Sequence, residues 1–301
     1  MCLTISEGIE RYLDIHRASS SARTVQYYEE NLRKFESFLD CYFITLGFAG
    51  YVYDIDEQLF LDYVMYLRKR GIKNVSINTY TRAVRSWCSW LLDNNYIEKS
   101  FVKGVRKLRD DSAIVYPLTF ADVRYIDQYL IHRTYGQRDQ IIFLLMLGCG
   151  LRRQEVINLN KEDIKEHCLV VRNSKYNKSR LVPLPSLIRV YIEDYCNLDS
   201  PGPLLLTKTG SRITEDVIRK MFSDIRKETK IKVYPHLLRH TFATSYVVGG
   251  GNLEFLRIIL GHSSYNVTQK YLHVAMQCML SDVDIYRLDK CFFKNYNNGG
   301  Y

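Results

Sequence analysis

The sequence has no long hydrophobic run. Its longest, IIFLLMLGCGL at 141–151, contains eleven residues, whereas about twenty are needed to span a bilayer as a helix. We therefore expect a buried helix over residues 138–147 and no membrane partner. The N-terminal stretch MCLTISEGIERYLDI has acidic residues where an export signal would be basic and then apolar, so a cytoplasmic protein is expected.

Paired cysteines and clustered carboxylates are also missing. The eight cysteines are scattered, with no CxxC pair and no histidine beside them at metal-ligand spacing. This pattern is typical of free thiols in a reducing compartment. The sequence shows no dense group of carboxylates that would hold Mg²⁺. We accordingly expect neither a metal ion nor another cofactor.

The length and the distribution of charge indicate two domains of different character. A chain of 301 residues is long enough for two domains. Residues 113–301 contain 26 Lys and Arg against 18 Asp and Glu, whereas the two classes nearly balance over residues 1–112. A basic excess concentrated on one domain makes a polyanion such as nucleic acid a candidate partner.

Residues 1–108 have the periodicity of about four amphipathic helices. A capping-box pattern, Thr4-x-x-Glu7, stands at the start of the first helix. A later helix is expected to begin with Ser76 as its N-cap. Residues 109–116 are charged and lack sustained periodicity, so we interpret them as a linker.

Residues 117–301 combine helices with one β signal. A second capping-box pattern, Thr119-x-x-Asp122, starts a helix, and two β-rich runs, CLVVRN and SRLVPL, are separated by the basic segment SKYNK. This spacing predicts an antiparallel hairpin. The fold class is therefore expected to be mainly α with a small antiparallel β-sheet.

Four short polar patterns follow one another in this basic half. They are GLRRQEV at 150–156, the hairpin segment SKYNK, PHLLRH at 235–240 and LGH at 260–262. Each alone has an ordinary structural explanation, such as a surface ion pair one helical turn apart or a helix that ends at a glycine. Their order is more specific, and so is the tyrosine that stands nine residues after the histidine of LGH.

In this order the patterns resemble the tyrosine recombinase family, which includes the phage integrases and the Xer-like site-specific recombinases. The resemblance covers nearly the whole chain. It implies that residues 1–108 form a helical, SAM-like core-binding domain that clamps DNA, and that residues 117–301 form a catalytic domain. It also implies that a C-terminal helix, from about residue 280, docks on a neighbouring subunit in trans.

The resemblance assigns catalytic roles to six positions. They are Arg152, Lys175, His236, Arg239, His262 and the nucleophile Tyr271. Tyr176 stands where a glycine commonly follows the hairpin lysine, so Lys175 and Lys178 are both candidates for that role. Glu155 is expected either to support the helix near Arg152 or to form a plain ion pair. Tyr265 is interpreted as a packing residue.

These residue types suit the cleavage of a phosphodiester. Charge builds on the phosphate oxygens in the transition state, and Arg152 and Arg239 offer planar donors that stay charged. A tyrosine hydroxyl with a pKa near 10 needs a proton acceptor, for which His236 is the candidate. The resemblance implies that Lys175 protonates the leaving 5′-oxygen, which becomes a hydroxyl, and that His262 donates to a non-bridging oxygen.

The function expected from these residues is site-specific recombination, by a covalent 3′-phosphotyrosyl intermediate, for integration, excision or resolution of DNA. The expected partners are double-stranded DNA with inverted half-sites and further copies of the chain, from a dimer to a synaptic tetramer. A second recombinase or an accessory DNA-bending protein can also be required. Two alternatives stay open: DNA relaxation of the type IB topoisomerase kind, and a DNA-binding protein that has lost catalysis.

Overall fold

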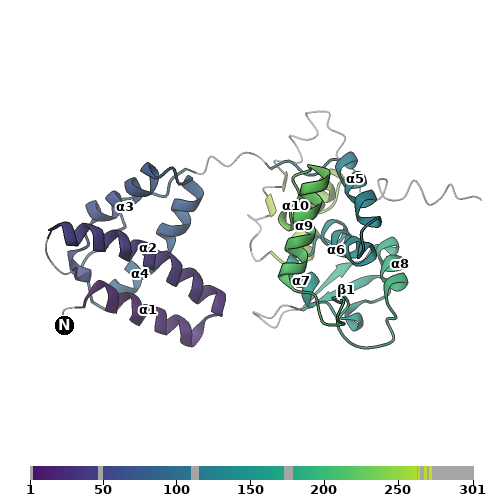
Figure 1. Cartoon of the computed structure of the whole chain (residues 1–301), viewed down its shortest axis with the longest axis horizontal. Coiled ribbons are helices and arrows are strands. Elements are labelled where there is room, and N and C mark those ends of the chain that lie inside the picture. The colour runs from purple at the N-terminus through teal and green to yellow at the C-terminus, as the bar shows by residue number, and fades with distance from the viewer. Residues whose placement is uncertain are drawn as a thin grey trace, which may run out of the picture. The chain divides into compact units, whose positions relative to one another are not determined.

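The computed structural model describes residues 3–46, 50–109, 115–172 and 179–262, together with 264, 268, 269, 271 and 272. The chain divides into two compact units, Met1–Ala113 and Ile114–Tyr301, and each has its own hydrophobic core. The division falls inside the segment 109–116. Figure 1 draws the first unit in purple to blue and the second in teal to yellow.

The first unit is built from helices. They are α1 (Ile5–Ser19), α2 (Ala22–Leu46), the 3-10 helix η1 (Val52–Asp54), α3 (Glu57–Lys69) and α4 (Asn74–Asp93). The predicted capping box is confirmed, since the Thr4 hydroxyl accepts the Glu7 N–H and the Glu7 carboxylate accepts the Thr4 N–H. The predicted helix start at Ser76 is wrong. Its N–H already donates to the Lys73 carbonyl, so Ser76 lies inside the first turn of α4.

Aromatic side chains join all four α-helices of this unit. Phe35 of α2 makes edge contacts with Tyr63 of α3, at 4.9 Å between ring centroids, and with Trp87 of α4, at 6.4 Å. The Trp87 Nε1–H donates to the carbonyl of Gly8 in α1 at 3.1 Å, so the one polar atom of this ring is satisfied inside the core. These rings, with the buried aliphatic side chains around them, form the hydrophobic core that holds the helices together.

The second unit is built around one buried helix, α6 (Gly136–Gly148). The helices packed against it are α5 (Phe120–Ile131), α7 (Arg153–Asn158), α8 (Ser186–Tyr195) and α10 (Pro235–Val248), and the remaining helical elements are η2 (Lys161–Asp163), α9 (Glu215–Thr229) and α11 (Leu253–Leu260). Residues 141–147 are all buried, which confirms the buried helix expected over 138–147. The predicted capping box at Thr119 and Asp122 is also confirmed.

A two-stranded antiparallel sheet is described in this unit, formed by β1 (Cys168–Val171) and β2 (Arg180–Pro183). Its register places Val171 opposite Arg180 and Cys168 opposite Pro183, which confirms the predicted hairpin. The connecting residues 173–178 lie outside the described residues. Strand β2 packs against α11, so the hairpin borders the C-terminal part of the unit.

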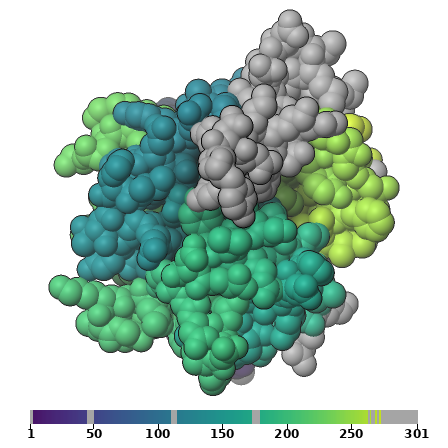
Figure 2. All heavy atoms as spheres, turned by 90° about the vertical axis from the view of Figure 1, so that its right-hand side faces the viewer, coloured from purple at the N-terminus to yellow at the C-terminus, as the bar shows by residue number. Residues whose placement is uncertain are grey.

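These elements confirm the expected fold class, mainly α with a small antiparallel β-sheet. Figure 2 shows one face of the second unit, with α5 in blue on the left, the α8 region in green below and α11 in yellow-green on the right. Among the helices of the described ranges, none is both long enough and apolar enough to cross a membrane.

Candidate active site

Arg152 lies at the start of α7, just after the glycine turn that ends α6. Gly150 has a φ of 64°, and a Cβ at this position would lie 2.4 Å from the Phe242 ring, so the turn requires glycine. Arg152 occupies the N-cap of α7, where its N–H and its Nη1 donate to the Glu155 carboxylate at 2.8 and 2.9 Å. The side chain keeps 39% of its surface exposed, so its guanidinium is accessible to an anion from solvent.

Arg239 lies on the buried face of α10. It is only 4% exposed, and its donors reach the Gly150 carbonyl at 2.6 Å, the Leu260 carbonyl at 2.6 Å and His262 Nε2 at 3.1 Å. Burial and the like charge of Arg152 lower the pKa of Arg239 to about 10. The guanidinium therefore remains protonated at neutral pH. His236 lies one turn earlier on the same helix and is exposed.

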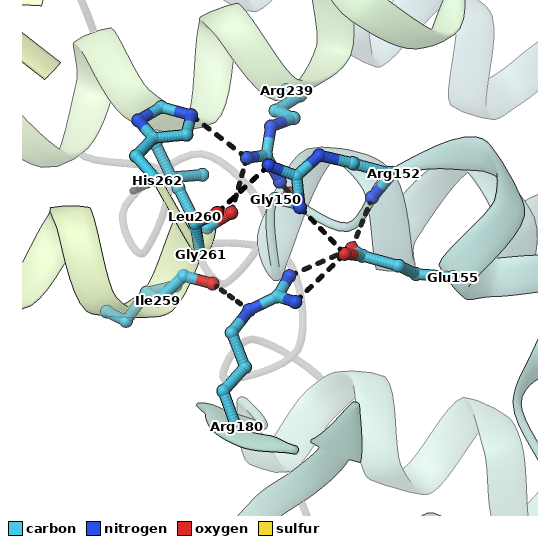
Figure 3. A network of polar contacts seen from close by, with 9 residues as sticks. All are labelled: Gly150, Arg152, Glu155, Arg180, Arg239, Ile259, Leu260, Gly261 and His262. Carbon is cyan, nitrogen blue, oxygen red and sulfur yellow. Dashed lines mark hydrogen bonds and ion pairs between the residues drawn. The ribbon is translucent and has the colours of Figure 1, made fainter. Parts of the chain in front are cut away.

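The C-terminus of α11 is the place where three arginines meet (Figure 3). The carbonyl of Ile259 accepts from Arg180 Nε at 2.7 Å, that of Leu260 from Arg239 Nη2 at 2.6 Å, and that of Gly261 from Arg152 Nη2 at 3.2 Å. The last carbonyls of a helix lack intrahelical donors and form the negative end of the helix dipole, so they attract cations. Gly261, with a φ of 62°, ends the helix abruptly at this point.

Arg180 is a residue to which the sequence patterns assigned no role. It begins β2 on the same side of the strand as the buried Val182. Its two terminal nitrogens donate to the two Glu155 oxygens at 2.8 Å each, and its side chain is 12% exposed. A charged residue on the buried side of a strand is the sequence signal that indicates such a pair, because an unpaired buried charge is strongly unfavourable.

Glu155 accepts hydrogen bonds from both Arg152 and Arg180, and it therefore joins α7 to β2. Burial by itself would raise the pKa of the Glu155 carboxyl. The hydrogen bonds and charges of Arg180 and Arg152 outweigh burial, and the pKa is lowered. Glu155 is accordingly an ionised carboxylate at neutral pH, held between two guanidinium groups.

Tyr271 is buried beside this cluster, with 5% of its surface exposed. Its ring centroid lies 5.3 Å from that of His240 and 6.4 Å from that of His262, to which it is nearly parallel. Burial raises the pKa of the Tyr271 phenol, and the charges of Arg239 and Arg152 oppose this rise. The phenol is thus protonated at neutral pH, and the two arginines make its ionisation easier than burial alone would allow.

His240 is a second residue that the sequence patterns did not assign. It follows Arg239 directly in PHLLRH, and its Nε2 donates to the Val115 carbonyl at 2.6 Å. Its ring is also a direct neighbour of Tyr271. Adjacency to Arg239 was the only local signal, because its partner Val115 lies 125 residues away in the sequence.

His262 has a defined protonation pattern in this arrangement. A guanidinium can only donate, so His262 Nε2 accepts from Arg239 Nη2. The proton of the neutral imidazole then resides on Nδ1, which donates to the Thr268 hydroxyl at 3.0 Å. Thr268 is fully buried, and its hydroxyl can both donate and accept.

The structure thus brings together five of the residues singled out in the sequence. They are Arg152, Glu155, Arg239, His262 and Tyr271. Lys175, its alternative Lys178, and Tyr265 lie outside the described residues. His236 lies on α10, as the pattern implied, on the exposed side of the first turn.

The charge of the cluster favours an anionic ligand. Three guanidinium groups, from Arg152, Arg180 and Arg239, lie near one carboxylate, that of Glu155, which accepts hydrogen bonds from Arg152 and Arg180. Fixed arginine forks of this kind match the geometry of phosphate oxygens. Within the described ranges, no group of three or more His, Cys, Asp or Glu side chains could hold a metal ion.

Comparison with known proteins agrees with this chemistry. Residues 117–278 match the phage integrase family. The tyrosine recombinase XerC of Staphylococcus carnosus (strain TM300) is 28% identical over 296 residues, which cover 89% of this chain and 90% of XerC.

Two solved structures have the same fold. The Tn1549 transposon integrase in complex with circular intermediate DNA shares 19% identity at a TM-score of 0.73, over 92% of this chain and 99% of that one. The XerH site-specific recombinase bound to palindromic difH substrate, a post-cleavage complex, shares 19% identity at a TM-score of 0.70, over 94% and 84% of the two chains.

Proposed function

This chain belongs to the phage integrase family, and we propose that it is a tyrosine site-specific recombinase that cuts and rejoins DNA through a covalent intermediate. The Tyr271 oxygen attacks the scissile phosphorus while the bond to the 5′-oxygen breaks. A 3′-phosphotyrosyl ester forms and a free 5′-hydroxyl is released. Because the ester is conserved, a second 5′-hydroxyl can reverse the step without ATP.

The observation that supports this proposal most strongly is the position of Tyr271 next to a surplus of positive charge. The charges of Arg239 and Arg152 both lower the pKa of this buried phenol against the effect of burial. The same two groups suit the negative charge that builds on the phosphate oxygens during attack. One pair of arginines therefore serves both the nucleophile and the phosphate.

The roles of the two arginines differ with their exposure. Arg152 is partly exposed and its bond to the Gly261 carbonyl is long, at 3.2 Å, so a phosphate oxygen can replace that acceptor. Arg239 is buried with short bonds to two carbonyls, and it supplies fixed charge. His236 is the proposed proton acceptor for Tyr271, and Lys175 or Lys178 is the proposed donor to the leaving 5′-oxygen.

His262 is proposed to donate a hydrogen bond to a non-bridging phosphate oxygen. Its Nε2 accepts from Arg239 in the present arrangement, so donation requires the proton to move from Nδ1 to Nε2. The Thr268 hydroxyl allows this change, because it can turn and donate to Nδ1 instead of accepting from it. Thr268 thus supports both tautomers of His262.

Residues 1–108, which make up most of the first unit, are proposed to act as the DNA-clamping core-binding domain. The proposed substrate is a duplex with inverted half-sites, since the XerH complex contains a palindromic substrate. Two half-sites related by two-fold symmetry require at least two protomers, and strand exchange between two such duplexes requires four. The cytoplasmic location stays a prediction of this proposal, as does any need for a second recombinase or DNA-bending protein.

The proposal is tested with a suicide substrate, a duplex nicked just beyond the scissile phosphate so that the released fragment diffuses away. The duplex is the sequence that the full-length protein selects from a randomised library. We expect the wild-type protein and Tyr265→Phe to form a covalent adduct, and Tyr271→Phe to bind the same DNA without forming one. A normal adduct yield from Tyr271→Phe would refute the assignment. Relaxation of supercoiled DNA that lacks the selected site would instead favour the topoisomerase alternative.

The C-terminal residues, from about 280, are proposed to dock on a neighbouring subunit. They lie outside the described residues, and the proposal depends on the family resemblance and on their amphipathic sequence. A protein truncated after residue 279 should bind one half-site normally but fail to assemble four-subunit complexes on DNA. Full assembly by the truncated protein, measured by light scattering, would contradict this role.

A further inference from the structure

Arg180 connects three segments of the second unit through a single guanidinium. Its Nε donates to the carbonyl of Ile259 in α11, and its two terminal nitrogens donate to Glu155 in α7. Arg180 itself begins β2, opposite Val171 in β1. Figure 3 shows this side chain extending from the strand towards Glu155 on one side and Ile259 on the other.

Two of these segments present residues of the proposed active site. Glu155 holds the N–H and Nη1 of Arg152 at 2.8 and 2.9 Å, so the orientation of Arg152 depends on where the Glu155 carboxylate is fixed. Arg180 fixes both oxygens of that carboxylate in a two-pronged pair, which is the most orientation-specific ion pair available to proteins. The position of Arg152 is therefore set partly by a residue that does not touch it.

The other segment ends at the turn that leads to His262. The Arg180 side chain packs closely against Gly261, where an added Cβ would lie 3.2 Å from Nη1 and 3.3 Å from Cδ and Cζ. Together with the bond to the Ile259 carbonyl, this contact fixes the end of α11 one residue before His262. The positive φ favours glycine at 261, and a larger residue there would also crowd the Arg180 side chain.

From this geometry we infer that Arg180 is a positioning residue for the cleavage reaction, acting on Arg152 through Glu155 and on the end of α11 through Ile259. The inference rests on the proposed function. A lysine at this position would keep the charge but could not form three directed hydrogen bonds in one plane. A displacement of Arg152 by about 1 Å is enough to slow the reaction by about 100-fold without a comparable effect on binding.

A matched control is available in Arg212, another arginine that bonds to three acceptors. It donates to the carbonyls of Ile157 and Leu159 and to the Asn160 side chain at the far end of α7. It resembles Arg180 in the number of acceptor atoms, although these are two carbonyls and an amide oxygen and include no carboxylate, and it contacts no residue of the proposed site through them. Arg180→Lys and Arg212→Lys are therefore compared under identical conditions.

The experiment measures single-turnover adduct formation by full-length protein on the suicide substrate at saturating enzyme. We expect Arg180→Lys to lower the rate constant by about 100-fold, with the final adduct yield and the DNA affinity within about threefold of wild type. Arg212→Lys should keep the wild-type rate constant. If Arg180→Lys lowers only the yield, or slows the reaction no more than Arg212→Lys, Arg180 is merely structural and the inference fails.

A second substrate tests the route through Arg152. It carries sulfur in place of the bridging 5′-oxygen, so the leaving thiolate needs no proton. Because Arg152 acts on the phosphate rather than on the leaving group, the deficit of Arg180→Lys should persist on this substrate. Restoration of the wild-type rate would overturn the route. If the wild-type protein forms no adduct, the proposed function is refuted. If the wild-type protein forms the adduct and Arg180→Lys has the same rate constant, only the inference about Arg180 is refuted.

Discussion

The second unit holds two arginine clusters that are satisfied in opposite ways, one by carboxylates and the other largely by backbone carbonyls. In the first cluster, Arg133 and Arg138 both bond to the buried Asp139, and Arg133 also bonds to Asp224. Two cations meet two carboxylates. The guanidinium groups are held firmly, and their charge is cancelled.

The second cluster contains Arg152, Arg180 and Arg239 but one carboxylate, that of Glu155. Its other acceptors include carbonyl oxygens from Gly150 and from the end of α11. A carbonyl attracts a guanidinium through its dipole without neutralising it. The guanidinium groups of the second cluster are therefore also held by hydrogen bonds, but the cluster keeps a surplus of positive charge that can bind a phosphodiester.

The largest difference between the two clusters is expected when Arg239 is replaced. We expect Arg239→Lys to lower the rate constant of adduct formation by about 1000-fold, because a buried lysine supplies one point charge in place of a fork fixed by the Gly150 and Leu260 carbonyls. Arg133→Lys, in the neutral cluster, should leave the rate of folded enzyme within about threefold of wild type. Equal slowing of the two variants in single-turnover assays would contradict the distinction.

Replacement of Asp139 should lower the free energy of unfolding without changing the rate constant of adduct formation. The side chain is fully buried between two arginines, and Asp139→Asn leaves a charge surplus there. We expect a loss of about 3 kcal/mol in the free energy of unfolding, measured by urea denaturation, with an unchanged rate constant for the folded fraction. A variant of normal stability, or one that is stable but slow, would show that the two clusters do not differ in this way.

Thr268 gives a smaller, local test within the charged cluster. Thr268→Val removes the hydroxyl next to His262 Nδ1 with little change in shape. We expect about tenfold slower adduct formation, because one hydrogen bond of this kind contributes on the order of 1 kcal/mol. Thr268→Ser keeps the hydroxyl and should retain most of the wild-type rate. Similar rates for the valine and serine variants would remove Thr268 from the mechanism.

The smallest expected effect is a shift in the titration of residue 271. A 3-nitrotyrosine incorporated there has an absorbance distinct from the other tyrosines. A nearby positive charge favours phenolate, so Arg152→Gln should raise the pKa of the label, and less of it will be ionised at a given pH. Arg133→Gln should leave its pKa unchanged. A fall in the pKa with Arg152→Gln would mean that Arg152 does not act electrostatically on this position.

Local patterns predicted much of this architecture. Two capping boxes, the buried helix at 138–147 and the antiparallel hairpin all follow from interactions between residues near one another in sequence, and each is confirmed. The prediction of Ser76 as the N-cap of α4 is wrong by three residues, because several polar residues near Ser76 can begin a helix and the N-cap is Lys73, whose carbonyl accepts the Ser76 N–H. Short-range patterns locate elements well and their ends less well.

The roles of Arg180 and His240 could not be predicted from local sequence patterns. The partners of Arg180 lie 25 residues away, at Glu155, and 79 residues away, at Ile259. The carbonyl partner of His240 lies 125 residues away. Such pairs form only when the fold brings the segments together, and no periodicity connects them.

The amino-acid sequence alone identified the candidate residues of the site, which are the arginines, the histidines and a tyrosine at a fixed spacing after LGH. Which acceptors hold those arginines was decided by the tertiary structure. The fold brings α10, β2 and the start of α7 to the end of α11, and their three guanidinium groups donate to three successive carbonyls. A helix end has acceptors without full negative charges, and for that reason the arginines are fixed in place while their charge remains available.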